Sequence, residues 1–491
     1  MWPWVSASGP LVTRLLHALL ALVLLCAWAS LASQVLLLVG ARGLLPVAEA
    51  VDFLRAQPVL GLADFPSIFW YVRPTDGVLL GGCGLGILLA CTALLGVAPR
   101  ACLALSAPLY FSYAVACDVF TTFQWDAMLV EVCVLAALVR RDRDDPLPHT
   151  LLRALLFKLY FESGVAKLQS PLGDWLDGSA MRFYYETAPL PGVLAWYAHQ
   201  LPPWWHAFES RATLVLELLV PFFVFGPRRF RLTAFVALSA FQLINLATAN
   251  YGFFVWLSLA LHVTLLDDSD LSRLYAWFRA QLPARLSALR LPWHRPTVAR
   301  PFSRGWERTR TALVGAYAVL WLVASLAAFA DYFTSARGAP IPRVAQLASA
   351  TSLANTYHLF TSITRERVEP QVEISRDGHR FEELDLLYKP GAPSRAPGLV
   401  APHQPRVDFR LWFYGLSYRG APPGYVDALL DQLCWDPDAV APLFVHAPPR
   451  SLRAVRLAFY RYTFTDAREH ARTGAWWRRV RLGDGDAHPC E

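Results

Sequence analysis

Long apolar runs constrain this chain more than any other feature. The first run, residues 11–39, carries few polar side chains and is long enough to cross the hydrocarbon core of a bilayer, which takes about 20 helical residues. More such runs follow, and the mean hydropathy is +0.33 with only 17% charged residues, whereas soluble domains carry about 25%. These values exclude an ordinary soluble enzyme and a disordered chain.

We expect about nine transmembrane helices. A signal peptide is the alternative for the first run, but the apolar stretch continues beyond its Ala27-Trp28-Ala29 site, which favours a retained anchor. Residues 48–71 are amphipathic and are expected at the membrane interface. The expected spans are residues 11–39, 77–97, 101–119, 124–139, 151–168, 211–225, 232–249, 252–266 and 311–330.

Arginine-rich breaks predict the orientation of these spans. They follow the second, fourth, sixth and eighth spans, so with the N-terminus inside all of them are cytoplasmic, as the positive-inside rule requires. Residues 169–210 and the region after residue 330 then lie on the outer or lumenal face. Because the net charge of +7 is carried mainly by these breaks, nucleic acid is not an expected partner. The breaks are Arg100 and residues 140–143, 226–231 and 267–310.

The region after residue 330 has the pattern of a second, soluble domain. We therefore divide the chain into a helical membrane domain, residues 1–330, and an extracytoplasmic β-rich domain, residues 331–491, of the sandwich type. Two strands around an Asp377-Gly378 turn predict a hairpin. Further expected elements are a strand over residues 456–465, a helix over 425–433 and a Pro-rich loop over 390–405.

Several multi-residue motifs resemble the lipase maturation factor family. The resemblance runs in order over roughly residues 10–480, and the number of separate motifs makes it specific. It implies a polytopic membrane protein that, in animals, resides in the endoplasmic reticulum and is needed for dimeric lipases to reach their active fold. The motifs include Glu162-Ser163-Gly164-Val165-Ala166-Lys167-Leu168, Asn250-Tyr251, Asn355-Thr356-Tyr357-His358-Leu359-Phe360 and Ala401-Pro402-His403-Gln404-Pro405-Arg406.

A fainter likeness links the helical part to the membrane domain of vitamin K-dependent carboxylases. No catalytic residue of those enzymes can be matched here, so none is carried over. The Ala- and Arg-rich composition looks bacterial. We expect a multi-pass protein of the bacterial inner membrane with its C-terminal domain outside, or of the endoplasmic reticulum membrane if the chain is eukaryotic.

The fifth expected span contains the most unusual polar group. Lys158 and Glu162 lie four residues apart, hence on one helical face, and Lys167 follows in the same helix, although the chain has only three lysines. Ionisable residues inside a membrane are functional candidates, and we name Lys158, Glu162 and Glu217 as candidate catalytic residues. The alternative is that Lys158 reaches the cytoplasmic boundary and pairs with Glu162. Other candidates for a polar interior are Asp118, Asp126, Glu131, Gln242, Asn245 and His262.

The predicted outer loop, residues 169–210, is dense in Trp, Tyr and Pro. These aromatic side chains fit a membrane-interface belt or a cap that grips apolar surface of a client protein. The two interpretations are compatible. The client-binding candidates are Tyr184, Tyr185, Trp204 and Trp205.

Metal and redox chemistry have little support. His199, His206 and Glu209 offer zinc-type ligands, but a Pro-Pro break separates the histidines and no His-Glu-x-x-His pattern occurs. We therefore expect no metal and no cofactor. Cys434 and Cys490 both lie on the predicted oxidising face and are disulfide candidates, while the other six cysteines fall in the expected spans.

The leading functional hypothesis is a membrane-embedded maturation or folding factor. Its partners would be a secreted client protein, a lipase by family resemblance, and membrane lipid. The alternative is a membrane enzyme that acts on a lipid or a peptide through the Lys158 and Glu162 site. A transporter is a third, weaker hypothesis.

Overall fold

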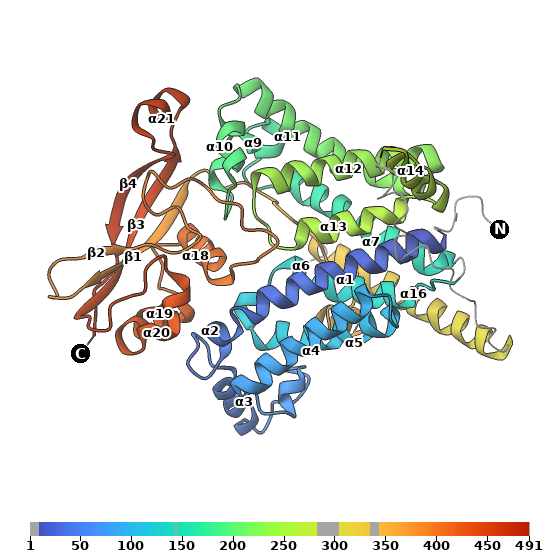
Figure 1. Cartoon of the computed structure of the whole chain (residues 1–491), viewed down its shortest axis with the longest axis horizontal. Coiled ribbons are helices and arrows are strands. Elements are labelled where there is room, and N and C mark those ends of the chain that lie inside the picture. The colour runs from blue at the N-terminus through green and yellow to red at the C-terminus, as the bar shows by residue number, and fades with distance from the viewer. Residues whose placement is uncertain (1–8, 143–144, 282–303, 334–342, 491) are drawn as a thin grey trace.

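The computed structural model describes residues 9–142, 145–281, 304–333 and 343–490. A bundle of helices forms one side of the molecule and a small antiparallel sheet with its own helices forms the other, as Figure 1 shows. Part of the predicted cytoplasmic segment, residues 282–303, and Arg143 of another break lie outside the described residues.

Each expected span overlaps a helix among the described residues. Within the part of the chain that the structure describes, only α1, α4, α12 and α16 are long and apolar enough to cross a membrane, judged by length and composition. The others are shorter or carry buried charges, so the number of nine spans stays a prediction. The helices are α1 (Pro10–Ala32), α4 (Asp76–Leu94), α5 (Pro99–Ala116), α6 (Gln124–Leu138), α7 (Pro146–Leu168), α11 (Pro203–Leu218), α12 (Arg228–Thr248), α13 (Phe254–His262) and α16 (Arg304–Phe333).

The helix ends gather at two opposite ends of the bundle. At the end away from the sheet, which we call the far end, the Arg100 Nε donates to the carbonyl of Ala137 at 2.8 Å and the amide of Leu11 donates to Asp268 at 3.1 Å. The predicted arginine-rich breaks that the structure describes lie here. At the other end, which we call the sheet end, α1, α5, α7, α12 and α16 finish and α4, α6, α11 and α13 begin.

Short helices fill the connections between the long ones. Most are at the sheet end, where the chain makes its longest detours. They are α2 (Val35–Val39), α3 (Val47–Ala56), η1 (Ile68–Trp70), η2 (Asp118–Thr121), α8 (Asp174–Asp177), α9 (Ala180–Thr187), α10 (Val193–His199), η3 (Val220–Phe225), η4 (Val263–Leu265), α14 (Asp268–Gln281) and α17 (Arg343–Ala350).

The sheet has the strand order β2-β1-β3-β4, with the short β5 also paired to β3. The predicted hairpin is present, since Ile374 of β1 pairs with Glu382 of β2 across the Asp377-Gly378 turn. The predicted strand and helix correspond to β3 and α19. The elements are β1 (Arg367–Ser375), β2 (Glu382–Leu384), α18 (Arg406–Leu416), α19 (Gly424–Trp435), α20 (Pro437–Val440), η6 (Ala441–Leu443), β3 (Ala454–Phe464), α21 (Ala467–Thr473), β4 (Trp477–Asp484) and β5 (His488–Pro489).

The predicted sandwich is wrong for the described residues, which hold a single sheet. Helices take the place of the second sheet: α18 packs against β1, and α19 packs against β3. One continuous cluster of buried apolar side chains runs from Leu16 in α1 to Trp477 in β4. The helices and the sheet therefore share one core.

Candidate functional site

Helix α7 brings Lys158, Glu162 and Lys167 to the interior of the bundle, where all three are buried. Lys158 lies near the middle of the helix rather than at a boundary, and its Nζ donates to Ser325 Oγ of α16 at 2.8 Å. Its ionic partner is Glu131 of α6, with Nζ 3.6 Å from Oε1. Contrary to the alternative interpretation, Lys158 lies away from the ends of α7, and its ion pair is with Glu131 rather than with Glu162.

Glu131 is the most heavily bonded acid of this cluster. Its Oε1 accepts a hydrogen bond from Trp321 Nε1 at 2.8 Å. Its Oε2 accepts from the backbone amide of Asn355 at 3.1 Å, from Asn355 Nδ2 at 2.7 Å and from the Tyr357 hydroxyl at 2.8 Å. A fully buried carboxylate needs such compensation, and most of it comes from a segment more than 200 residues away in sequence.

That segment, residues 355–360, crosses the sheet end of the bundle without regular secondary structure. Its backbone groups must find other partners, and side chains of the helices supply them. Glu162 Oε2 accepts from the amide of Tyr357 at 2.7 Å, Gln124 Oε1 accepts from the amide of His358 at 2.9 Å, and Ser163 Oγ accepts from the amide of Leu359 at 3.3 Å.

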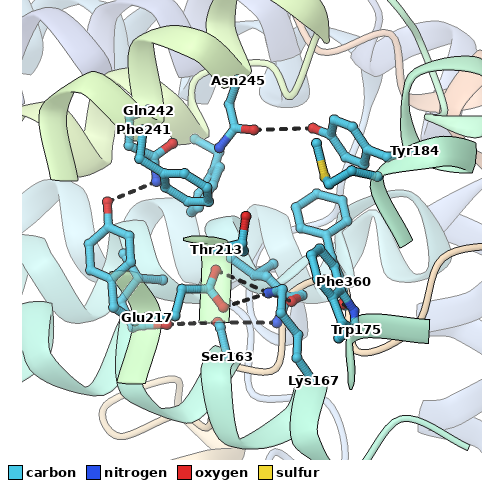
Figure 2. A pocket seen from close by; sticks show the side chains of 15 residues that line it. Ser163, Lys167, Trp175, Tyr184, Thr213, Glu217, Phe241, Gln242, Asn245 and Phe360 are labelled. Atoms are coloured by element: carbon cyan, nitrogen blue, oxygen red, sulfur yellow. Dashed lines mark hydrogen bonds and ion pairs between the residues drawn. The ribbon is translucent and has the colours of Figure 1, made fainter. Parts of the chain in front are cut away.

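Lys167 completes the attachment of this segment. Its Nζ donates to the carbonyl of Leu359 at 2.8 Å and lies 3.0 and 2.7 Å from the two carboxylate oxygens of Glu217 on α11. Figure 2 shows this buried ion pair beside Ser163 and Phe360. The predicted polar site thus binds residues 355–360 of the same chain.

A cavity of about 40 Å³ adjoins the ion pair. It is large enough for about three water molecules at 10–15 Å³ each, whereas pockets for small-molecule ligands measure about 300–1,000 Å³. Neither a lipid nor a peptide fits in it. Its polar lining, seen in Figure 2, includes Ser163, Lys167, Tyr184, Thr213, Glu217, Gln242 and Asn245.

A second segment, residues 398–406, enters the bundle between α1, α5 and α6. Arg406 forms a bidentate pair with Asp126 of α6, with Nη2 to Oδ1 at 2.8 Å and Nη1 to Oδ2 at 3.0 Å, and both residues are buried. The Tyr110 hydroxyl also donates to Asp126 at 2.6 Å. Bidentate, charge-assisted geometry of this kind makes a strong and directional contact.

Amide side chains hold the rest of the second segment. Asn250 Oδ1 accepts from the amides of Val400 and Ala401 at 2.7 and 3.0 Å. Gln34, which precedes α2, donates to the carbonyl of Gln404 at 2.8 Å and accepts from the amide of Arg406 at 3.1 Å. The predicted Pro-rich loop is therefore an ordered part of the contact between the helices and the sheet.

Two of the client-binding candidates are unavailable to a client. Tyr184 and Tyr185 are buried, with their hydroxyls donating to Asn245 Oδ1 at 3.2 Å and to Glu209 Oε1 at 2.8 Å. The sequence makes them client-binding candidates because it does not show that the aromatic loop, residues 169–210, folds back as α8 to α10. Trp204 is 68% exposed, and Trp205 is half-buried beside it with ring centroids 5.7 Å apart.

The aromatic loop also binds the sheet. Arg367 of β1 donates to the carbonyls of Glu186 and Pro189 at 3.1 and 3.0 Å, and also to that of Ala188. In return, Glu186 Oε2 accepts from the amide of Phe464 in β3 at 2.6 Å. Burial raises the pKa of Glu186 above its ordinary value.

The remaining candidates are the disulfide cysteines and the possible metal ligands. Cys434 and Cys490 form a disulfide that links α19 to the C-terminal end of the chain. His199 and His206 face different carboxylates, Glu186 at 3.7 Å and Glu209 at 3.3 Å. Within the described ranges, no group of three or more His, Cys, Asp or Glu residues is placed to hold a metal ion.

Comparisons with known proteins agree with this arrangement. A family profile described as the lipase maturation factor transmembrane domain matches residues 11–273, and one described as the lipase maturation factor C-terminal domain matches residues 353–486. The chain belongs to the lipase maturation factor family. This result confirms the resemblance seen in the sequence motifs.

Relatives in this family span most of the chain. Lipase maturation factor 2 of Gallus gallus is 31% identical, over 94% of this chain and 79% of the relative, and that of Homo sapiens is 30% identical, over 94% and 80%. Lipase maturation factor 1 of Homo sapiens is 29% identical, over 91% and 82%. No solved structure matches the chain.

The motifs that carry the lipase maturation factor resemblance contact one another. The motif that begins at Glu162 binds the one that begins at Asn355, and Asn250 binds the segment that leads into Arg406. Sequence reasoning named Asp126 and Glu131 as interior acids but did not find their partners. An unpaired carboxylate in an apolar run, matched with an arginine in a Pro-rich motif, is the signal that points to the pair of Asp126 and Arg406.

Proposed function

We propose that this lipase maturation factor family member has no catalytic step of its own and assists the folding of secreted client proteins. One observation carries the proposal: Glu162 of the supposed catalytic site binds the chain's own Tyr357, while Lys158 and Glu217 are held by Ser325 and Lys167. A catalytic group must reach its substrate, whereas Lys158, Glu162 and Glu217 are buried and occupied. The name of the relatives supports a secreted lipase as the client.

We place the sheet end on the outer or lumenal side of the membrane, with residues 331–491 beyond it. The far end carries the described arginine-rich turns, which favours the cytoplasmic side. The disulfide between Cys434 and Cys490 lies in the sheet part, which suits an oxidising compartment. This orientation holds for a bacterial inner membrane and for an endoplasmic reticulum membrane.

The helices then hold the sheet part, residues 343–490, and the aromatic loop in place. Polar groups at the sheet end bind two separate C-terminal segments, and the loop binds β1 and β3. Trp204 remains the accessible aromatic candidate for contact with apolar client surface, at the start of α11. Transient shielding of such surface requires neither a metal nor a cofactor.

A secretion assay tests the absence of catalysis. The chain is co-expressed with a secreted lipase in cells that lack their own maturation factor, and secreted lipase activity is divided by the amount of folded chain. For Lys158→Met and Glu162→Gln we expect less folded chain but unchanged activity per folded molecule, because both residues act on folding. A variant that is folded, binds lipase and yields inactive lipase supports the membrane enzyme instead.

A matched pair of tryptophans tests client contact in the same assay. Trp204 and Trp435 are 68% and 67% exposed, but Trp435 lies on α19 in the sheet part. We expect Trp204→Ser to lower lipase activity several-fold and Trp435→Ser to leave it unchanged, with equal amounts of folded chain. Equal effects of the two substitutions contradict a client site at Trp204. Deletion of residues 340–491 is a poor test, because it removes both segments that complete the bundle.

A further inference from the structure

The connection between α1 and α4 exposes several large apolar side chains. Between α3 and the start of α4, exposed large apolar side chains follow one another, and Val59 is 90% exposed. Large apolar side chains exposed in succession are a signature of interaction sites. We call residues 47–72 the α3 lip, and its exposed side chains are Phe53, Val59, Leu60, Leu62, Ile68, Tyr71 and Val72.

Charge is distributed unevenly over the α3 lip. Residues 57–62, Gln-Pro-Val-Leu-Gly-Leu, contain no charged side chain. The charged residues near them bind within the lip and its flank: Asp64 Oδ2 accepts from the amide of Gly61 at 2.8 Å, and Arg55 donates to the carbonyl of Phe69 at 3.3 Å. A solvent-exposed turn is normally rich in polar residues, so this uncharged tip is unsuited to water.

Hydrogen bonds to α5 fix the position of the lip along the axis of the bundle. Ser67 Oγ donates to the carbonyl of Ser112 in α5 at 3.0 Å, and the Ser112 hydroxyl accepts from the amide of Ile68 at 3.2 Å. Since α5 ends at Ala116, η1 lies about one helical turn, roughly 5 Å, inside the sheet end of that helix. Figure 1 shows α3 on the outside of the bundle, next to α2 and α4.

The apolar surface of the lip continues onto α4. This helix is long and apolar enough to span a membrane, and it exposes Leu80, Leu85 and Leu88. Its first turn is tied to α5 where the lip is attached, because the Tyr113 hydroxyl donates to the carbonyl of Leu79 at 2.6 Å and the Tyr113 ring packs on Phe69. The lip is therefore attached beside the first turn of a helix that is long and apolar enough to span a membrane.

The sequence already predicts an interfacial position for residues 48–71, and we propose further that the α3 lip is a lipid-binding element that inserts its uncharged tip into the leaflet at the sheet end, at the boundary between headgroups and acyl chains. Amphipathic segments bind there through buried apolar area. The continuity with α4 and the depth set by Ser112 favour lipid over a protein partner. The lip thereby adds a non-spanning anchor beside the spanning helices.

Thiol accessibility tests the proposal on the full-length chain, purified and inserted in phosphatidylcholine nanodiscs without a client. Val59→Cys is compared with Leu88→Cys, which is 61% exposed on the apolar helix α4, and with Val480→Cys on β4, which is 54% exposed in the sheet part. A water-soluble maleimide reacts with the thiolate, which needs water. Labelling of the parent chain is subtracted, and each value is divided by labelling after unfolding.

We expect Val59→Cys to react as slowly as Leu88→Cys, at least about fivefold more slowly than Val480→Cys, because a thiol in apolar surroundings stays protonated. A phosphatidylcholine with a photoreactive acyl chain should also cross-link to peptides from residues 47–72. Labelling of Val59→Cys at the rate of Val480→Cys, together with no cross-link in the lip, overturns the proposal and leaves this surface to a client protein.

Discussion

The two ends of the helical bundle are both rich in charge, but they use it differently. At the far end, ion pairs join neighbouring helix ends and keep one partner open to water, as where buried Arg140 pairs at 2.6 Å with Glu307, which is 29% exposed. At the sheet end, the acids are fully buried and bind C-terminal segments, as Asp126 binds Arg406. The far end thus joins neighbouring helices to one another, whereas the sheet end joins two parts of the chain.

The largest expected effect is at the sheet end. Asp126→Asn removes the carboxylate that compensates buried Arg406, and leaving one charge of a buried pair alone costs about 3–5 kcal/mol of unfolding free energy. Thermal unfolding of the purified chain in detergent measures this cost. The double variant Asp126→Leu/Arg406→Met should recover much of the stability, because it removes both charges.

Glu131→Gln is expected to cause the second largest loss of stability. The amide keeps the shape of the side chain but removes the charge that faces Lys158 and replaces one acceptor oxygen by a donor. We expect a loss of about 2–3 kcal/mol, as for hydrogen bonds to a charged group, and faster proteolysis near Asn355. If proteolysis near Asn355 is unchanged while stability falls, Glu131 does not hold this segment.

In the sheet part, the buried carboxyl group of Asp408 should make the stability of the fold depend on pH. It is buried in α18, where its Oδ1 accepts from the amide of Tyr388 at 3.3 Å, and burial raises its pKa to about 6. Because the folded state holds this proton more tightly than the unfolded state, its stabilising contribution is complete below about pH 4 and is lost as the pH rises through about 6.

Asp408→Asn cannot lose a proton at this position. We therefore expect the variant to be more stable than the parent chain by roughly 3 kcal/mol at pH 7.5 and equally stable at pH 4. Unfolding midpoints measured at both pH values check this. A variant that is less stable at pH 7.5 indicates that the charged form of Asp408, facing Lys389, stabilises the fold.

The smallest effect belongs to the far end. Glu307→Gln weakens a partly exposed pair, and such pairs contribute less than about 1 kcal/mol. The difference from the parent chain should shrink further in high salt, because exposed charges are screened. A loss as large as that of Asp126→Asn contradicts the distinction between the two ends.

Local patterns in the sequence predicted much of the fold. The apolar runs locate the long helices, the Asp377-Gly378 turn locates the hairpin, and the motifs identify the family. The sandwich was wrong because the sequence pattern of a strand indicates burial but does not show what covers the buried face. Helices α18 and α19 cover it here.

The site was harder to predict because its contacts join residues far apart in sequence. The spacing of Lys158 and Glu162 correctly places them on one helical face, but helical spacing cannot show that Glu131 and Tyr357 approach from other elements. Burial of Tyr184 was missed for a similar reason. An aromatic-rich loop has the same composition whether it packs inward or faces a client.

The long-range contacts of Glu131 and Asp126 have a consequence for biosynthesis. Asn355 follows Glu131 by 224 residues and Arg406 follows Asp126 by 280, so each acid is synthesised long before its partner. Until translation has passed Arg406, the bundle holds carboxylates that lack these partners. A prematurely terminated chain therefore keeps buried carboxylates without these partners. The stability of the helical bundle thus depends on complete synthesis of the C-terminal half.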